Sequence, residues 1–300
     1  MSLIIKPGGS FTHKSGASFG VKGSALPPYV IDGLEQSHWD MASAVVSSGR
    51  VTSVPDSSNV QALGPASSVA LPVNPTYEAS GWSLNGKTLP VARFIASSAD
   101  GNAALQANTW ATKISGYSGA YTVACLVKPD SSLTPSNSVN YGSAFGFGSA
   151  FPSPSVQGGP AWVNGQARWN TYRKIPSGAS YKYIEAYYGS TFSSNHQLWV
   201  FQYDASASSA LDQWKLWING TLQTTYQGAS GWTSGNAPQY GRAAMTPSVF
   251  LVGAAYDEGN TSRASTLACR IAQMHIWKGA LTDEQRNNVT AYLKSISGIA

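Results

Sequence analysis

Apolar residues recur with two different spacings over the last fifty residues, and the change of spacing marks where strands give way to a helix. Apolar runs at 249–254 and 268–277 predict two strands, the second of them alternating. Beyond these strands, apolar side chains return every three or four positions, which predicts a helix. Thr282 and Gln285 have the spacing of a capping box, and Gly298 is placed to end the helix in a left-handed conformation. The sequence therefore predicts two strands followed by one closing helix.

Alternating and apolar segments upstream predict further strands. The segment 121–129 is apolar on both faces, as expected of a central strand that is covered on both sides. Asn219-Gly220 stands between two alternating segments and predicts a hairpin, because both residues tolerate the positive φ of a type I′ turn. Between 130 and 196, Pro and Ser clusters predict loops with short aromatic strands between them. The clearest strands are predicted at 89–95, 121–129, 197–204, 213–218 and 221–225.

The first thirty residues differ from the rest of the chain. They are rich in Gly, Ser and Lys, and no acidic residue precedes Asp32. We predict an extended N-terminal arm over 1–30 and one β-rich domain over 31–300, with inserted loops around 130–196. An ordered arm with little apolar periodicity needs something to bind, and we expect a partner subunit to fill this role.

The composition excludes several classes of protein. Charged residues make up 11% of the chain, against about 25% in an ordinary globular protein. The net charge of +5 is scattered, with no basic run of the kind that follows a phosphate backbone, so we expect no nucleic-acid partner. No uninterrupted apolar stretch reaches the ~18 residues of a membrane span. The apolar part of the N-terminus is too short for a signal peptide, and we expect a protein that is made in the host cytoplasm and is either kept there or leaves by lysis.

The hairpin and the closing helix carry a resemblance to a known family. The segment 216–220, Leu-Trp-Ile-Asn-Gly, resembles the Leu-Tyr-Val-Asn-Gly hairpin of laminin-G-like domains. The order strand, strand, helix at the end of the chain resembles the C-terminal end of the same laminin-G-like, concanavalin-A-like family. The resemblance runs discontinuously over 38–298 and is most specific over 197–298. It implies an all-β fold, an antiparallel jelly-roll β-sandwich with one C-terminal α-helix.

Cysteines and histidines give little sign of chemistry. Cys125 and Cys269 both fall in predicted strands with apolar neighbours, so we interpret them as buried small apolar residues. A disulfide between them is the alternative, since the two strands could be neighbours. The four histidines show no metal-ligand spacing and are interpreted as surface or satisfied core residues: His13, His38, His196 and His275.

Acidic residues do not form the pattern of a glycosidase. Sandwich glycosidases use carboxylates at alternating positions of one strand, which places them on one face beside the sugar. Asp257 and Glu258 are adjacent and would face opposite sides, and Glu185 stands alone in its strand. We therefore predict that the protein is not an enzyme.

A metal site is implied only by the family resemblance. Laminin-G-like domains often hold Ca²⁺ in loops at one rim, through carboxylate, amide and carbonyl oxygens. Asp257, Glu258 and Asn260 form an acidic loop cluster between two predicted strands and are the candidate ligands. We favour a solvated loop, because the cluster has fewer ligands than Ca²⁺ prefers, and we expect no other cofactor.

Aromatic residues near the loops are the candidate ligand-binding residues. Tyr and Trp rings stack on sugars while their polar tips stay hydrated. Trp162, Trp169, Tyr187, Tyr188 and Trp232 lie in or beside the loop-rich parts and are assigned to ligand binding. Three others fall inside predicted strands and are assigned to the core: Trp199, Trp214 and Trp277.

Together these observations predict a non-enzymatic structural or adhesion protein of a virion. A bacteriophage capsid-decoration or tail-fibre component would fit, anchored to other virion proteins by its N-terminal arm and forming a homo-oligomer. The first alternative is a lectin-like module that recognises cell-surface polysaccharide. The second alternative is a polysaccharide hydrolase with an atypical site.

Overall fold

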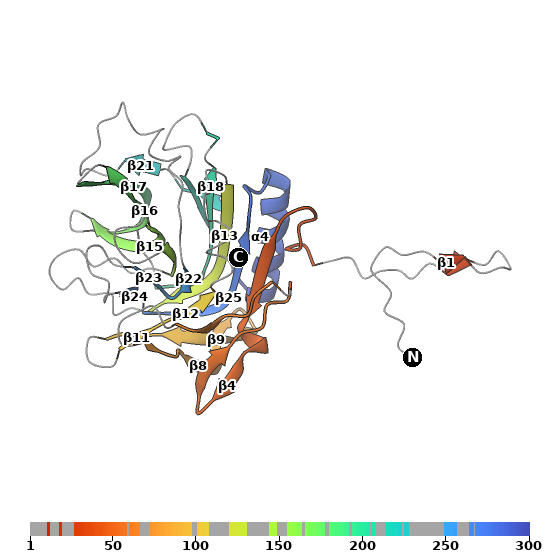
Figure 1. Ribbon diagram of the computed structural model, residues 1–300. Coiled ribbons are helices and arrows are strands. Elements are labelled where there is room, and N and C mark those ends of the chain that lie inside the picture. Colours follow the sequence, from red (N-terminus) through yellow and green to blue (C-terminus); the bar gives the residue numbers. More distant parts are fainter. Residues whose placement is uncertain are drawn as a thin grey trace.

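A computed structural model describes the fold of most of the chain. The described residues are 11–12, 18–19, 27–58, 60–66, 72–97, 101–107, 120–130, 144–148, 155–163, 166–177, 180–191, 194–204, 206–207, 214–223, 225–227, 249–256, 264–266 and 268–300. Within them the protein is mostly β-strand, with one α-helix, α4 (Asp283–Ser297), near the C-terminus (Figure 1). The prediction of an all-β protein closed by one C-terminal helix is confirmed.

The larger sheet contains ten strands, and all of its pairs are antiparallel. β13 lies near its centre, between β18 and β25, and β3 pairs with β25 beside the main path. In spatial order the strands are β20 (Thr221–Leu222), β19 (Trp214–Ile218), β18 (Gln197–Asp204), β13 (Ala120–Pro129), β25 (Cys269–Trp277), β9 (Lys87–Phe94), β8 (Thr76–Leu84), β5 (Arg50–Ser53) and β4 (Val45–Ser47), with β3 (Gln36–Asp40) added on β25.

The second sheet contains eight antiparallel strands. In order they are β21 (Thr225–Gln227), β17 (Ser180–Thr191), β16 (Gln166–Ser177), β15 (Ser155–Val163), β14 (Phe145–Gly148), β22 (Val249–Val252), β12 (Leu105–Ala107) and β6 (Gly64–Pro65). Smaller pairings join β1 (Phe11–Thr12) to β2 (Ser18–Phe19), β11 (Gly101–Ala103) to both β10 (Ala96–Ser97) and β7 (Pro72–Val73), and β23 (Ala254–Tyr256) to β24 (Ala264–Thr266).

Between 130 and 196 we predicted short strands among loops, and the described part of this region contains long strands instead. β15, β16 and β17 have 9, 12 and 12 residues and follow one another as neighbours in the second sheet. Polar residues and Pro interrupt their sequences, so periodicity alone predicts only fragments. Pairing with neighbouring strands supplies the backbone hydrogen bonds that extend each fragment.

The two large sheets pack face to face around one apolar core. Trp39 of β3 stacks on Phe250 of β22, with ring centroids 5.6 Å apart. Phe145 of β14 meets Phe201 of β18 edge to face at 5.1 Å. These rings belong to a continuous cluster of buried residues from both sheets, so the arrangement is a β-sandwich.

The outer face of the larger sheet is covered by α4 (Figure 1). Val123 and Cys125 of β13 belong to the core between the sheets, whereas Ala124 and Leu126 belong to a second core that includes Leu293 of the helix. The prediction that 121–129 is a central strand covered on both sides is confirmed. The large sheet is therefore the middle of three layers.

Local signals at the two ends of α4 are confirmed. Thr282 Oγ accepts from the Gln285 N–H at 3.2 Å, and the Thr282 N–H donates to Gln285 Oε1 at 2.9 Å. Gly298 ends the helix with φ 75°, and a Cβ there would collide with the Leu84 carbonyl oxygen. Trp82 Nε1–H donates to the Ser297 carbonyl at 2.8 Å. The C-terminal end of the helix is thus fixed to β8.

The predicted hairpin and cysteine assignments also hold. Asn219 and Gly220 have φ values of 52° and 84° between β19 and β20, as a type I′ turn requires. Cys125 and Cys269 are both buried and both free. Burial is the main cause that raises the pKa of each thiol far above its usual range. The interpretation as buried apolar residues is confirmed, and the disulfide alternative is not formed.

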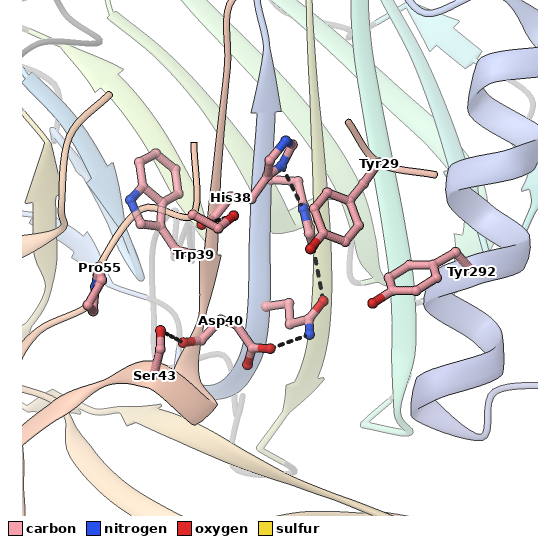
Figure 2. A pocket seen from close by; sticks show the side chains of 10 residues that line it. Tyr29, His38, Trp39, Asp40, Ser43, Pro55 and Tyr292 are labelled. Atoms are coloured by element: carbon pink, nitrogen blue, oxygen red, sulfur yellow. Dashed lines mark hydrogen bonds between the residues drawn. The ribbon is translucent and has the colours of Figure 1, made fainter. Parts of the chain in front are cut away.

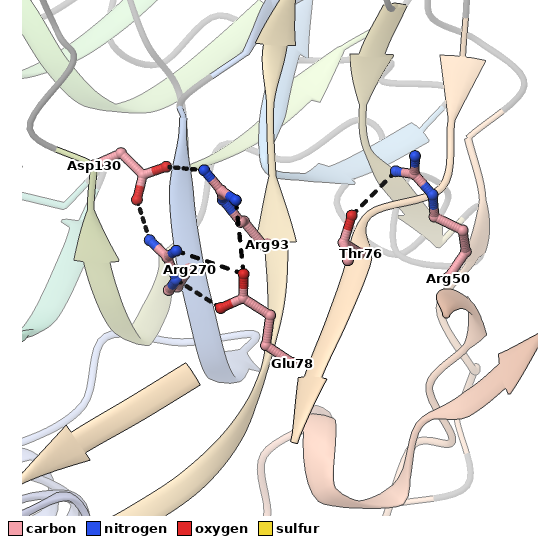
Figure 3. Close-up of polar contacts among 6 residues, drawn as sticks. All are labelled: Arg50, Thr76, Glu78, Arg93, Asp130 and Arg270. Atoms are coloured by element: carbon pink, nitrogen blue, oxygen red, sulfur yellow. Dashed lines mark hydrogen bonds and ion pairs between the residues drawn. The ribbon is translucent and has the colours of Figure 1, made fainter. Parts of the chain in front are cut away.

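A ring of four charges ties four strands together on the outer face (Figure 3). Glu78 accepts from Arg270 Nε at 2.7 Å and lies 3.8 Å from Arg93 Nη1. Asp130, just after β13, pairs with Arg270 and lies 3.5 Å from Arg93 Nη2. Each carboxylate therefore meets both guanidinium groups, and this compensation indicates a structural tie between β8, β9, β13 and β25.

No helix among the described residues is long and apolar enough to cross a membrane.

Candidate functional site

Strand β3 carries the candidate site on the outer face of the large sheet. β25 pairs with β9 through Cys269–Ile271 and with β3 through Gln273–Trp277, so the pairing partner changes partway along β25. In this register His38 lies opposite His275, and Asp40 lies opposite Gln273. Because side chains alternate along a strand, Trp39 enters the core while His38 and Asp40 face outward beside α4.

A buried carboxylate holds β3 in place. Asp56 is 6% exposed and accepts five hydrogen bonds. Ser37 Oγ donates to it at 2.6 Å and the His38 N–H at 3.0 Å. The remaining three donors are backbone N–H groups of the following turn: those of Ser58, Val60 and Gln61.

These elements enclose a pocket of about 230 Å³ between β3, β25 and α4 (Figure 2). Tyr29 and Tyr292 line one side of it with half-buried rings that contact each other, their centroids 5.2 Å apart. Tyr29 is held by its carbonyl oxygen, which accepts from Trp277 Nε1–H at 3.0 Å. The floor is buried and the rim is exposed; the floor residues are His38, Trp39, Gln273 and His275, and the rim residues are Asp40, Ser43, Pro55 and Ser57.

A directed chain of hydrogen bonds runs along the pocket floor. Gln273 Nε2 donates to Asp40 Oδ2 at 2.9 Å, because a carboxylate can only accept. Gln273 Oε1 therefore faces His275 Nε2, 3.1 Å away, and accepts a hydrogen bond from its N–H. A neutral His275 must then accept at Nδ1, which lies 2.9 Å from Nδ1 of His38. The chain fixes His275 as the Nε2–H tautomer and His38 as the Nδ1–H tautomer.

Both imidazoles are neutral at pH 7. Burial lowers the pKa of His38 to about 4, although the charge of Asp56 acts in the opposite direction. Burial, with a further contribution from His38, holds the pKa of His275 well below its usual range. His38 Nε2 is consequently a bare acceptor, and it is a buried atom without a hydrogen-bond partner.

The negative charge of Asp40 reaches both tyrosines. Burial raises the pKa of Tyr29, and Tyr292 and Asp40 raise it further. Burial also raises the pKa of Tyr292, again with a contribution from Asp40. Both phenols therefore stay protonated at neutral pH and can donate or accept hydrogen bonds. The pocket thus offers hydroxyl, amide and carboxylate groups beside two aromatic rings.

The direction of the chain gives a first prediction. Asn at position 40 can still accept from the Ala42 N–H, as Asp40 does at 2.9 Å, but its amide nitrogen would face Gln273. We expect Asp40→Asn to turn the Gln273 amide over and to invert both imidazoles, giving Nδ1–H on His275 and Nε2–H on His38. Histidine ¹⁵N chemical shifts at pH 7 distinguish the two tautomers. Unchanged tautomers in the variant would contradict the assigned direction.

The predicted aromatic ligand-binding residues are not among the described residues that line this pocket. Trp162 lies in β15, Trp169 in β16, and Tyr187 and Tyr188 in β17, so four residues predicted in or beside loops fall in adjacent strands of the second sheet. Their side chains and the whole of Trp232 lie outside the described part of the structure, so their role in ligand binding stays a prediction. The core assignment of Trp199 and Trp277 is confirmed, as both are 0% exposed.

The predicted metal ligands fall in a segment that the structure does not describe. Asp257, Glu258 and Asn260 follow β23 and lie outside the described residues. Within the described residues, no group of three or more His, Cys, Asp or Glu side chains could hold a metal ion. The candidate calcium loop therefore stays a prediction.

The sequence did not reveal the pairing of His38 with His275. The two residues are 237 positions apart, and each looks like an isolated histidine in its own strand. The only usable signal was that both occur in strands with polar residues two positions away, Asp40 and Gln273. Strand register, which is set by tertiary contacts, brings the four side chains together.

Comparisons with known proteins give distant likenesses in structure alone. No family model and no curated protein matches the chain. A solved structure of Trypanosoma rangeli sialidase in complex with sialic acid matches with 11% identity and a TM-score of 0.44, over 89% of this chain and 34% of that one. An arabinofuranosidase complexed with arabinofuranosyl-α-1,2-xylobiose matches with 13% identity and a TM-score of 0.44, over 83% and 51%. The carbohydrate-binding module CBM40 of the Ruminococcus gnavus IT-sialidase, bound to α2,6-sialyllactose, has 14% identity and a TM-score of 0.37, over 61% and 87%.

These comparisons correct one prediction. The chain was predicted not to be an enzyme, and the similar solved structures include glycoside hydrolases. The prediction rested on carboxylates spaced along one strand. That criterion misses sites whose carboxylates come from separate strands, which pairing can bring together over any sequence distance. The chain spans about a third of the sialidases that it matches, and the TM-scores below 0.5 assign it no activity.

Proposed function

We propose that the protein binds a saccharide and that the pocket between β3, β25 and α4 holds one sugar unit. The observation that carries this proposal is a pocket with a buried polar floor and an exposed rim, lined on one side by two tyrosine rings that contact each other (Figure 2). Sugars present hydroxyl groups around an apolar ring, and they are bound by hydrogen-bonding side chains together with aromatic faces.

The size of the pocket supports a single unit. Its volume of about 230 Å³ lies below the roughly 300–1,000 Å³ of pockets that enclose drug-sized ligands. The exposed rim formed by Asp40, Ser43 and Ser57 would let the rest of a polysaccharide extend into solvent. A terminal or side-branch sugar therefore fits better than an internal segment of a chain.

A glycan array with the full-length chain, followed by titration calorimetry on the best ligand, tests this proposal. Tyr292→Ala is expected to weaken binding about two- to thirteenfold, which corresponds to the ~0.5–1.5 kcal/mol of an aromatic contact. Alanine keeps the helix, because it has the highest helix propensity. The matched control is Asn287→Ala, an exposed position on another face of the same helix, which should bind like the unmodified chain.

Thermal melting of both variants separates loss of ligand contact from loss of fold. Equal affinities for the two variants, or no binding above background to any glycan, would contradict the proposal. The laminin-G-like jelly-roll connectivity, the virion location, the arm's partner proteins and the homo-oligomeric state remain predictions. A sugar-binding pocket is compatible with the predicted adhesion role of the protein.

A further inference from the structure

Carboxylates are the charged groups that act on the pocket. Among its described lining residues Asp40 is the only acid, and neither Lys nor Arg is present; the charge of Asp56 acts on His38 from behind the floor. His38 and His275 contribute no positive charge, because both are neutral, and their tautomers follow from the hydrogen-bond chain that begins at Asp40. The field of Asp40 extends across the pocket, since it reaches both Tyr29 and Tyr292.

Charged groups on the neighbouring elements do not cancel this field. Lys278, the residue after β25, pairs with Glu35 at 3.2 Å. Arg286 of α4 pairs with Asp283 at 2.8 Å and lies over the Trp217 ring, 4.1 Å from its centroid. Neither cation pairs with Asp40, whose carboxylate accepts from the Ala42 N–H and from Gln273 Nε2.

We propose that the pocket selects sugar units without an acidic group, and that it binds an amino sugar more tightly than the neutral sugar of the same skeleton. This inference rests on the proposed saccharide binding. The carboxylate of a uronic or sialic acid would enter beside Asp40 with no cation to pair with, and desolvating two like charges together is unfavourable. The ammonium group of an amino sugar would instead form a charge-assisted hydrogen bond with Asp40.

Matched sugars in three charge states test the inference. The probes are the methyl glycosides of glucose, glucosamine and glucuronic acid, the same three forms of galactose, and N-acetylneuraminic acid, each titrated at pH 7 into the full chain. For whichever of the two sugars, glucose or galactose, binds to the protein, we expect its uronic acid to bind at least about tenfold more weakly than the neutral form. We expect the amino sugar to bind about three- to tenfold more tightly than the neutral one.

Asp40→Asn removes the charge and Ser43→Ala changes the rim without changing its charge. Because Asp40→Asn is also expected to reverse the hydrogen-bond chain on the floor, which alters all three forms of a sugar, affinities are compared between the three forms within one variant. Asp40→Asn should bring the neutral and amino sugars within about twofold of each other and recover most of the loss for the uronic acid. Ser43→Ala alters the same rim without changing its charge and should keep the original order. The amino and neutral forms should also converge as added salt screens Asp40.

Two failures can be told apart. A uronic or sialic acid that binds as tightly as the neutral sugar, or an order unchanged by Asp40→Asn, would overturn the charge selection and leave saccharide binding standing. Failure of every glycan on the array and of all the titrated sugars to bind would overturn both proposals.

Discussion

Replacing Asp56 with Ala is expected to lower the free energy of unfolding by about 3–5 kcal/mol. The change leaves five donors without their acceptor, and two of these bonds, from Ser37 Oγ and the His38 N–H, are buried. A buried donor without a partner costs about 1–3 kcal/mol, whereas the three donors in the turn are half-buried and can recruit water. Urea unfolding at pH 7, monitored by tryptophan fluorescence, measures the loss.

Asp56→Asn is the matched control, because it keeps the shape and one acceptor oxygen. The Asn variant should lose clearly less unfolding free energy than the Ala variant. Its amide oxygen can still accept from some of the five donors, although its amide nitrogen cannot. A loss below about 1 kcal/mol in Asp56→Ala, the size of one ordinary hydrogen bond, would show that the carboxylate does not hold β3 in place.

Acidification is expected to destabilise the fold before most carboxylates titrate. A histidine whose folded pKa is depressed contributes stability that is complete above its unfolded pKa of about 6.5 and is lost as pH falls toward the folded value. For His38, with a folded pKa of about 4, the loss between pH 7 and pH 3.5 amounts to about 3 kcal/mol. His275, with its pKa shifted in the same direction, adds to it.

Urea unfolding from pH 7 to pH 4 measures this dependence, and the control is the double variant His38→Leu/His275→Leu. Replacing both partners of a buried hydrogen bond with apolar groups of similar size costs little, and only the Gln273 Oε1 acceptor then loses the donor that His275 supplied, so the variant should fold. Its stability should vary much less between pH 6.5 and pH 4.5, a window above the usual range of carboxylate pKa values. Parallel pH profiles for the two proteins would show that the imidazoles are not buried as neutral groups.

Local features of the chain are predicted correctly by its amino-acid sequence. Three such features are the capping box of Thr282 and Gln285, the left-handed Gly298 and the Asn219-Gly220 turn. Each of them depends on residues that lie within four positions of one another along the chain. Backbone sterics and short-range hydrogen bonds determine them, so spacing suffices. The two-sided burial of 121–129 is equally predictable, because an apolar pattern on both faces of a strand leaves neither face for water.

The longest strands are less predictable because their stability is not local. The residues of β15, β16 and β17 give an interrupted pattern, and the hydrogen bonds that extend them come from neighbouring strands. The prediction that the protein is not an enzyme used the spacing of carboxylates along one strand as its criterion, and this criterion says nothing about groups that separate strands bring together.

Sequence alone therefore determined the class of the fold, its closing helix and its hairpin, since these follow from periodicity and from contacts between near neighbours. Only the tertiary structure decided the pocket. His38 and His275 meet across 237 residues, and Tyr29 and Tyr292 come together from opposite ends of the chain. Strand register and helix packing fix such meetings, and these depend on how the whole core fills its space rather than on any local pattern of residues.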